Sequence, residues 1–305
     1  QAWAANLPSG ATVVHGAVDL QQQGNDALRI LQGSQSAIVN WQSFDIGANA
    51  LVDIVQPNID SALLSRIVGG NPSEILGSLN ANGHLFLVNP NGIIFGKDST
   101  VDVHALIAST LDIADSAFLS GNISFTGDSE AAVINLGSIN AKSFAALVGG
   151  KVSNAGSITS SGGDAALLAA DATLEVGEAA GGKITLDLSG LLAGTAENSG
   201  SIDVASSSTT KGGSATILGE QVAVSGTVDA TGATGGGLVR IGGDYQGKNA
   251  NLTNAQSANI SGTISADSSY NGDGGRIIVW ADGVTTFTGD LSATGSGSGS
   301  GGFAE

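Results

Sequence analysis

The residues that could carry chemistry are few and widely spaced. His15, His84 and His104 are not spaced as a zinc-binding pair, and the chain has no cysteine, so neither a zinc site nor a thiolate site is predicted. The segment Asn271–Gly275, Asn-Gly-Asp-Gly-Gly, resembles one calcium-binding repeat, but such sites need stacked copies and it occurs once. We therefore expect neither a metal nor a cofactor.

The acidic residues give no catalytic pair either. Glu74 has no second carboxylate at a matching position, and no Gly-x-Ser-x-Gly elbow with a suitable histidine stands out. Parallel β-helices do host polysaccharide lyases, in which carboxylates and bases share one face. Asp164, Asp171 and Arg240 are candidates for such a group, but the sequence does not bring them together. A non-enzyme is preferred, and a lyase stays an alternative.

Charge and composition restrict the partners. The chain has 10 Lys and Arg against 27 Asp and Glu, a net charge of −17, which disfavours nucleic acid and anionic membranes. Hydrophobic residues make up 41% and charged residues 12%, so a folded core is expected. No apolar run is long enough to predict a transmembrane segment. Ala2-Trp3-Ala4 is either the remnant of a signal-peptide cleavage site or the mature start.

The stretch from Asn82 to Gly96 contains the clearest local signal. Its apolar segments Leu85–Val88 and Ile93–Phe95 read as short strands, and Asn89-Pro90-Asn91-Gly92 lies between them. Proline presets its own φ and asparagine can bond to its own backbone, so these four residues predict a type I turn. A fixed, exposed corner with few titratable groups favours recognition over catalysis.

A second local signal precedes this turn. Asn71, Pro72 and Glu74 fit the N-cap, N1 and N3 positions of a capping box. The pattern predicts one helical turn, which Gly77 would end.

Three segments together resemble the secretion (TPS) domain of two-partner-secretion exoproteins, the filamentous-haemagglutinin-like proteins of Gram-negative bacteria. They are Gly69–Leu79, Asn82–Gly83 and Val88–Gly96, and the resemblance is close over about residues 5–120. Gln56-Pro57-Asn58-Ile59 stands where the family often has Asn-Pro-Asn-Leu. The sequence is more similar to the adhesin and haem-acquisition branch than to the haemolysin branch.

The resemblance implies that the unfolded chain is recognised in the periplasm by the POTRA domains of an outer-membrane pore protein and folds outside the cell. The absence of cysteine suits this route, because a disulfide formed in the periplasm would make the chain too wide to thread. The predicted motif is either a recognition signal or a set of folding turns. Its residues are Asn89, Pro90, Asn91, Gly92, Gln56, Pro57, Asn58, Asn71 and Pro72.

A repeated corner predicts the architecture after residue 120. A glycine followed by Ser, Thr or Asp and then by an apolar residue recurs at Gly137, Gly156, Gly200, Gly226, Gly262 and Gly289. Such intervals, irregular multiples of roughly twenty residues, are typical of a parallel β-helix with variable loops. We expect an all-β fold, a right-handed parallel β-helix with an N-terminal cap and extra-helical β-hairpins.

The chain is expected to form one domain over residues 1–305. It would comprise a cap over about residues 1–50, motif-bearing coils and a hairpin over 51–120, β-helix coils over 121–295 and a truncated continuation over 296–305.

Aromatic and alanine-rich positions add three predictions. Trp41, Phe44 and Ile46 should close the open end of the core. Trp280 should pack in the core rather than stack on a sugar. The stretch 165–170 is predicted to be a strand, although its composition also suits a helix.

The predicted function is the N-terminal secretion module of a large extracellular adhesin, monomeric and located outside the cell or at its surface. The natural protein should continue as a longer β-helix, with a passenger that binds a host receptor or a polysaccharide. A haem-acquisition or contact-inhibition toxin passenger is the alternative of the same class, and a polysaccharide lyase is the alternative of another class.

Overall fold

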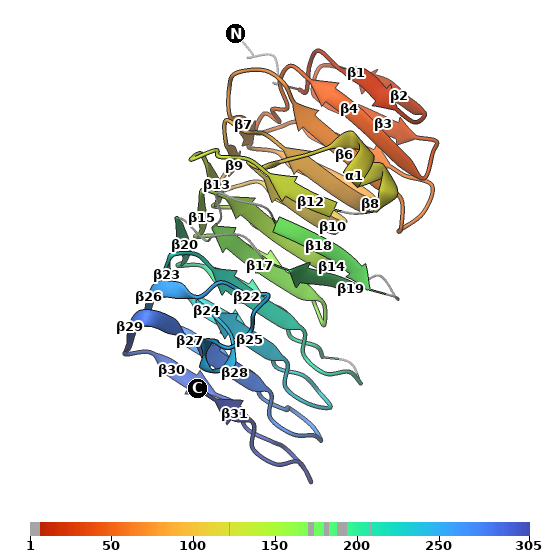
Figure 1. Ribbon diagram of the computed structural model, residues 1–305. Helices are drawn as coiled ribbons and strands as arrows, with labels where there is room; N and C mark the ends of the chain where they lie inside the picture. Colours follow the sequence, from red (N-terminus) through yellow and green to blue (C-terminus); the bar gives the residue numbers. More distant parts are fainter. Residues whose placement is uncertain (1–6, 122, 170–173, 180–182, 188–193, 208) are drawn as a thin grey trace.

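The computed structural model describes residues 7–121, 123–169, 174–179, 183–187, 194–207 and 209–305. The chain winds into a stack of coils that runs from the N-terminal end, red in Figure 1, to the C-terminal end, blue. Successive coils contribute strands to three parallel ladders, so the core lies inside the stack.

The first ladder includes the strands that follow the repeated Gly corners. They are β3 (Ala27–Gln32), β5 (Leu51–Val55), β8 (Ser78–Val88), β10 (Thr100–Ser109), β14 (Ser138–Gly149), β16 (Ser157–Thr159), β21 (Ser201–Asp203), β24 (Thr227–Asp229), β27 (Thr263–Ser265) and β30 (Asp290–Ser292). Their alternation sends the middle residue inward: Ile139 is buried, whereas Ser138 and Asn140 face outward.

The second ladder begins where β8, β10 and β14 bend; the register between β10 and its neighbours shifts between Val103 and Ala105. Its other members are β4 (Ser36–Trp41), β6 (Ala62–Ile67), β17 (Asp164–Ala169), β22 (Ser214–Leu218), β25 (Leu238–Ile241), β28 (Arg276–Val279) and β31 (Phe303–Ala304). The alanine-rich stretch 165–170 was predicted to be a strand, and β17 confirms this as far as residue 169.

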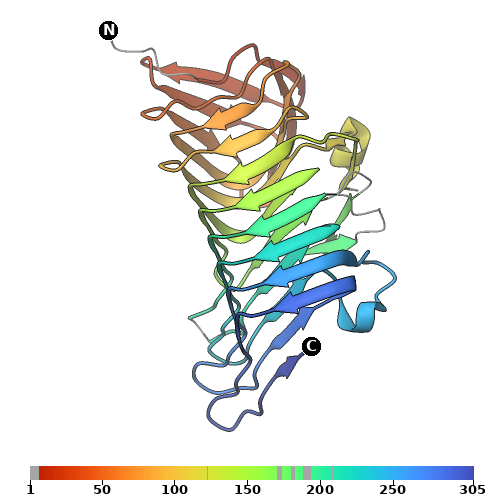
Figure 2. The ribbon, with the colours of Figure 1, turned by 90° about the vertical axis from the view of Figure 1, so that its left-hand side faces the viewer.

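The third ladder forms the face turned toward the viewer in Figure 2. It consists of β7 (Ser73–Ile75), β9 (Ile93–Phe95), β13 (Ala132–Asn135), β15 (Lys151–Asn154), β20 (Thr195–Asn198), β23 (Gln221–Val224), β26 (Ala255–Ile260) and β29 (Ala281–Phe287).

The repeated glycines stack on one another where the third ladder turns into the first. Ser157 N donates to Gly137 O over 2.8 Å, and Ser201 N donates to Gly156 O over 2.9 Å. A Cβ atom on Gly156 would lie 2.1 Å from Gly137 O, and one on Gly200 would lie 2.0 Å from Gly156 O. Only glycine permits such close backbone approach. The predicted Gly corners followed by short strands are therefore confirmed.

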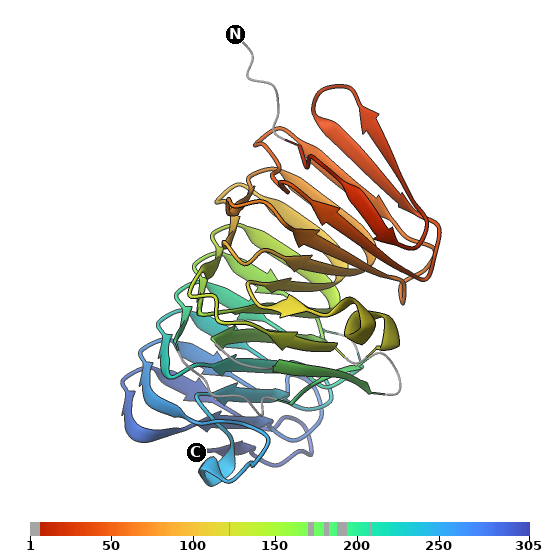
Figure 3. The same ribbon diagram turned by 45° about the horizontal axis from the view of Figure 1, so that its top comes forward.

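Antiparallel strands cover the N-terminal end of the stack (Figure 3). β1 (Thr12–His15) pairs with β4, and β2 (Val18–Gln23) forms a hairpin with β3. Trp41, Phe44 and Ile46 are buried beneath this end, and the Trp41 and Phe44 rings meet edge to face with centroids 5.4 Å apart. They were predicted to close the open end of the core; they are buried in it, and the antiparallel strands β1 and β2 cover that end.

A second hydrophobic cluster lies outside the coils, against the second ladder. It joins outward-facing residues such as Phe86 and Phe144 to Phe118 and Phe125, which belong to segments that leave the coil. These segments form α1 (Asp115–Ser120) and an antiparallel sheet of β11 (Asp112–Ile113), β12 (Ile123–Thr126), β18 (Leu174–Ala179) and β19 (Lys183–Asp187). The short 3₁₀ helix η1 (Tyr245–Gly247) lies in a further excursion.

Trp280 departs from its predicted place in the core. It lies half-buried on the outside of the coil, where a Cβ on Gly243 would lie 3.2 Å from its side chain, and its Nε1 donates to Asp282 Oδ1 over 3.0 Å. The prediction was wrong because the alternation that places Ile277 and Val279 inside sends Ile278 and Trp280 outward.

Candidate functional site

The Asn89–Gly92 turn connects β8 in the second ladder to β9 in the third. Gly92 N donates to Asn89 O over 3.0 Å, which closes the four-residue turn, and Asn91 N donates to Asn89 Oδ1 over 2.9 Å. Gly92 has φ of 115°, a conformation that L residues with side chains rarely adopt. The predicted turn and its side-chain-to-backbone bond are present, but the turn joins two ladders and is not a hairpin.

Asn89 is the buried centre of this turn. Its side chain is fully shielded from solvent, and its Nδ2 donates to Asn71 O and to Ser73 Oγ, both over 3.0 Å. Its backbone N donates to Ser109 O over 2.9 Å. The predicted exposed corner is therefore formed only by Pro90 and Asn91, while Asn89 faces inward.

The segment beside the turn is a strand and not the predicted helical turn. Ser73–Ile75 forms β7, which pairs with β9 in parallel, and Ser73 N donates to Gly92 O over 3.0 Å. Asp45 Oδ1 accepts the Glu74 N–H over 2.9 Å, the donor that a helix cap would have used. Ladder pairing overrides the local capping signal, because a strand here completes the third face of the coil.

The exposed part of the turn contacts the coils on either side. Asn91 Nδ2 donates to Gly69 O over 2.9 Å, and Ser129 Oγ donates to Pro90 O over 2.6 Å. Asn71 and Pro72 are exposed beside it. The solvent-facing surface of this corner, which we name the Asn89 corner, comprises Asn71, Pro72, Pro90 and Asn91.

The second predicted motif forms a separate corner between β5 and β6. Gln56 is buried; its Nε2 donates to Ser61 O over 2.9 Å and to Gln32 Oε1 over 3.2 Å, and its Oε1 accepts the Gly83 N–H over 2.9 Å. Pro57 and Asn58 are exposed. The buried amide of Gln56 thus bonds to the coils on both sides.

The structure does not bring the two motifs into one site. Gln56 bonds to the bend of β8 at residues 83–84, whereas Asn89 follows the end of β8. Beside the Gln56 corner, the His84 and His104 rings stack with centroids 5.7 Å apart and planes 8° apart. Burial lowers the pKa of His104 and Lys142 adds to this, while the charge of Asp60 opposes it.

The contact between Arg66 and an extra-helical segment had no signal in the sequence. Arg66 of β6 bonds to the first extra-helical segment through Asp112 at 2.8 Å, Asp115 at 2.7 Å and the Ile113 carbonyl. Burial lowers the pKa of Arg66, but hydrogen bonds and charges from both aspartates more than offset this, so the pKa lies above its usual value. The partners are more than forty residues away, and only the fold makes them neighbours.

The remaining predicted chemistry is sparse. Within the part of the chain that the structure describes, no three His, Cys, Asp or Glu residues gather as metal ligands, and no helix has the length and apolar character needed to cross a bilayer. Asp164 and Arg240 line one hollow, whereas Asp171 lies outside the described residues.

The fold is a stacked parallel β-helix with an Asn-Pro-Asn-Gly corner whose first asparagine is buried. The sequence model of the TPS secretion domain matches residues 4–284, and the chain belongs to this family. It is a non-catalytic module of two-partner-secreted exoproteins, which are secreted across the outer membrane and whose partner is a TpsB outer-membrane transporter.

Curated relatives carry the name heme/hemopexin-binding protein. One from Haemophilus influenzae is 39% identical over 165 residues, which cover 51% of this chain and 18% of the relative. Another from the same species is 37% identical over 121 residues, which cover 40% of this chain and 13% of the relative. The chain thus spans less than a fifth of the relatives that it matches.

Solved structures confirm the fold class. The HMW1 secretion domain from Haemophilus influenzae superposes with a TM-score of 0.69 at 28% identity, over 97% of this chain and 94% of that one. The filamentous hemagglutinin secretion domain gives 0.52 at 16% identity, over 99% and 100%, which supports the fold alone. The predicted resemblance and parallel β-helix are confirmed.

Proposed function

We propose that this chain is the secretion module of a haem-acquisition exoprotein. The observation that carries the proposal is the 39% identity to a protein named heme/hemopexin-binding protein. The module would engage the periplasmic POTRA domains of its TpsB partner as a monomer and deliver its passenger to the medium or the cell surface. Haem or a haem-carrying protein would be bound by the passenger, because the relatives extend far beyond the matched residues.

The adhesin passenger preferred from the sequence is now the weaker candidate. Both curated relatives are named for haem and hemopexin binding, and the likeness to the filamentous hemagglutinin domain, at 16% identity, carries fold information only. A direct test is to incubate the full-length secreted protein with haem–hemopexin complex and with epithelial cells. Capture of the haem–hemopexin complex would support the proposal. Attachment to the cells without capture of the complex would favour the adhesin passenger instead.

We propose that the exposed residues of the Asn89 corner are the ones that a partner could contact. Asn89 itself is proposed to act in folding. The support is its full burial and its bonds to Asn71 and Ser73. A side chain that is satisfied inside the folded coil holds the second and third ladders together. In a chain that folds as it leaves the pore, an early closed coil would nucleate the rest of the stack.

We expect Asn89→Ala to destabilise the purified module by about 3 kcal/mol, because it leaves buried polar groups without partners. Export through the co-expressed transporter should fall together with refolding followed by circular dichroism. Asn91→Ala should refold normally, and loss of its export would identify the exposed corner as a recognition signal. Asn140→Ala, on the exposed face of β14, is the matched control. Normal refolding of Asn89→Ala would contradict the folding role.

A further inference from the structure

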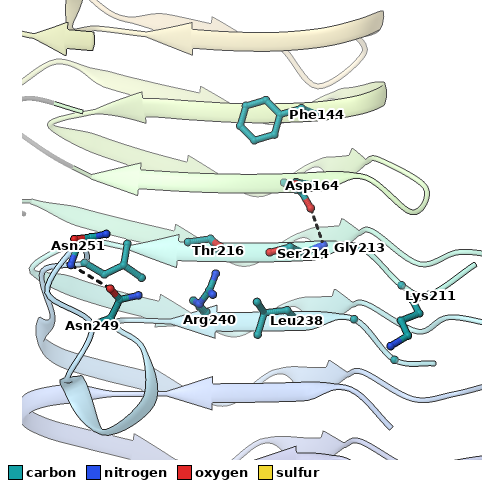
Figure 4. A pocket seen from close by; sticks show the side chains of 15 residues that line it. Phe144, Asp164, Lys211, Gly213, Ser214, Thr216, Leu238, Arg240, Asn249 and Asn251 are labelled. Carbon is teal, nitrogen blue, oxygen red and sulfur yellow. Dashed lines mark hydrogen bonds between the residues drawn. The ribbon is translucent and has the colours of Figure 1, made fainter. Parts of the chain in front are cut away.

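A groove runs along the outside of the second ladder in the C-terminal half. Its main hollow, of about 530 Å³, lies over β17, β22 and β25, between the loop that carries Lys211 and the excursion at Asn249–Leu252 (Figure 4). A second hollow of about 460 Å³ shares Lys211, Gly236 and Gly237 with the first and continues past Arg276 to Phe303. The five strands from β17 to β31 span about 19 Å.

Three of the chain's ten basic residues line this groove, in a protein of net charge −17. Arg240 stands on the floor, on β25, and Lys211 lies at the edge in Figure 4. Arg276 follows on β28, paired with Leu238 in the ladder. Such a concentration of cations, against the charge of the whole molecule, favours an anionic ligand.

The carboxylates in and beside the groove are held by hydrogen bonds within the fold, and Asp244 is the ion-pair partner of Arg240. Asp164 Oδ1 accepts the Ser214 N–H over 3.1 Å. Asp244 accepts from Tyr245 N and from Asn249 Nδ2, both over 2.8 Å. Asp273, which lines the second hollow, accepts the Ser300 N–H over 2.7 Å. These bonds hold the carboxylates in place without removing their charge, so three cations line the two hollows together with the carboxylates of Asp164 and Asp273.

The basic groups, by contrast, are incompletely satisfied. Arg240 Nε is buried and has no hydrogen bond, although it lies 3.2 Å from Asp244 Oδ2 in an ion pair. Lys211 makes no hydrogen bond or ion pair with any residue that the structure describes. Arg240 Nε is shielded from solvent beside Asp244, whereas the exposed Lys211 side chain is open to a ligand oxygen.

Neutral polar and aromatic groups complete the lining. Ser214, Thr216 and Asn251 offer hydroxyl and amide groups beside Arg240. The Arg276 guanidinium lies 4.9 Å from the Tyr245 ring centroid and 5.1 Å from that of Phe303. Hydroxyls, amides and aromatic faces suit sugar rings, and an arginine binds a carboxylate in two-point fashion.

We propose that this groove binds an acidic saccharide, with ring carboxylates paired to Arg240 and Lys211. A porphyrin is the less suitable ligand, because no His, Met or Cys lines either hollow and the chain has no Met or Cys. The proposal concerns the secretion module itself and is independent of the passenger. From the sequence, Arg240 was considered only as a candidate residue of a polysaccharide lyase; here it is proposed to bind a saccharide without cleaving it.

Calorimetric titration of the purified chain with a galacturonate tetramer tests the proposal. We expect saturable one-to-one binding that weakens as salt is raised, and no binding of neutral maltotetraose. Arg240→Gln, which keeps donors but removes the charge, should weaken binding about tenfold or more, and Lys211→Gln should act in the same direction. Lys151→Gln, an exposed base on β15, is the control and should leave the affinity unchanged.

Other outcomes overturn the proposal. They are absence of galacturonate binding, equal binding of maltotetraose, or equal weakening by Lys151→Gln. Unfolding curves of each variant would show whether a loss reflects the fold. If Arg240→Gln is unstable, Lys211→Gln, whose side chain bonds to no described residue, decides the question. Binding of iron protoporphyrin that Arg240→Gln abolishes, without saccharide binding, would assign the groove to a different ligand.

Discussion

Buried amide side chains fix the corners of three successive coils. Asn135 Nδ2 donates to Asn154 Oδ1 over 2.8 Å, and Asn154 Nδ2 donates to Asn198 Oδ1 over 2.8 Å. All three are fully buried, and Asn154 Nδ2 also donates to Ser201 O over 3.0 Å. Each amide satisfies its neighbour, so the polar ladder is tolerated within an apolar stack.

Replacing the central amide should therefore be expensive. Asn154→Ala leaves Asn198 Oδ1 and the Ser201 carbonyl without their buried donor, and we expect a loss of about 3 kcal/mol in the free energy of unfolding. Urea denaturation followed by circular dichroism measures it. The exposed Asn140→Ala should cost less than about 1 kcal/mol, because water can replace its bond to Asp102. Equal losses for both variants would refute the ladder's contribution.

The His84–His104 pair predicts a pH dependence. The pKa of His104 is lower in the folded chain than the unfolded value of about 6.5, chiefly because of burial, with Lys142 acting in the same direction and Asp60 opposing. The unfolded chain therefore binds more protons in this window, and stability should fall as pH drops below about 6.5. His104→Gln should flatten unfolding curves measured between pH 7.5 and about pH 5, whereas His15→Gln, in the exposed cap, should not.

At the scale of elements, short strands and Gly corners define each coil. A three-residue strand such as β21 buries one side chain, Ile202, and pairs with both neighbouring coils. The corner before it must let the chain approach the previous coil closely. In the C-terminal half the loops vary in length without disturbing the ladder, and several of them extend to the lower right in Figure 1.

A methyl group at a corner should disturb a coil more than one in a loop. In Gly200→Ala the new Cβ would meet Gly156 O at 2.0 Å, so backbone must move, and we expect a loss of at least about 3 kcal/mol. Gly301→Ala, with nothing within 4 Å, should change stability by less than about 0.5 kcal/mol. Thermal unfolding of both variants provides the comparison, and a tolerated Gly200→Ala would show that the stack can relax.

The whole molecule is a stack with one internal core and a second cluster on its outside. Each coil contacts mainly its neighbours, so folding can start at one end and propagate. The chain contains no cysteine, so no disulfide loop would widen it on the proposed route through an oxidising periplasm. Non-covalent stacking stabilises the folded protein, whereas the proposed passage through a pore needs an extended chain without covalent loops.

A disulfide across two coils should separate these requirements. Ser138 and Ser157 face each other in register, with their Oγ atoms 3.2 Å apart. The double variant Ser138→Cys, Ser157→Cys should be retained in the periplasm as an oxidised loop, because the loop is wider than an extended chain. Immunoblots of medium and periplasm would show this, and added reductant should restore export. Each single variant is the control, and undiminished export of the oxidised chain would contradict the threading argument.

The sequence alone determined the β-helix, the Gly corners, the Asn89 turn and the family, because these depend on local turn chemistry and on a repeat. The tertiary structure decided which side chains face inward. It buried Asn89, made residues 73–75 a strand and moved Trp280 to the outside. It also brought Lys211, Arg240 and Arg276 to one groove. Pairing between coils spans variable loops, as from Asn135 to Asn154 and on to Asn198, so neighbours are fixed by stacking and not by spacing.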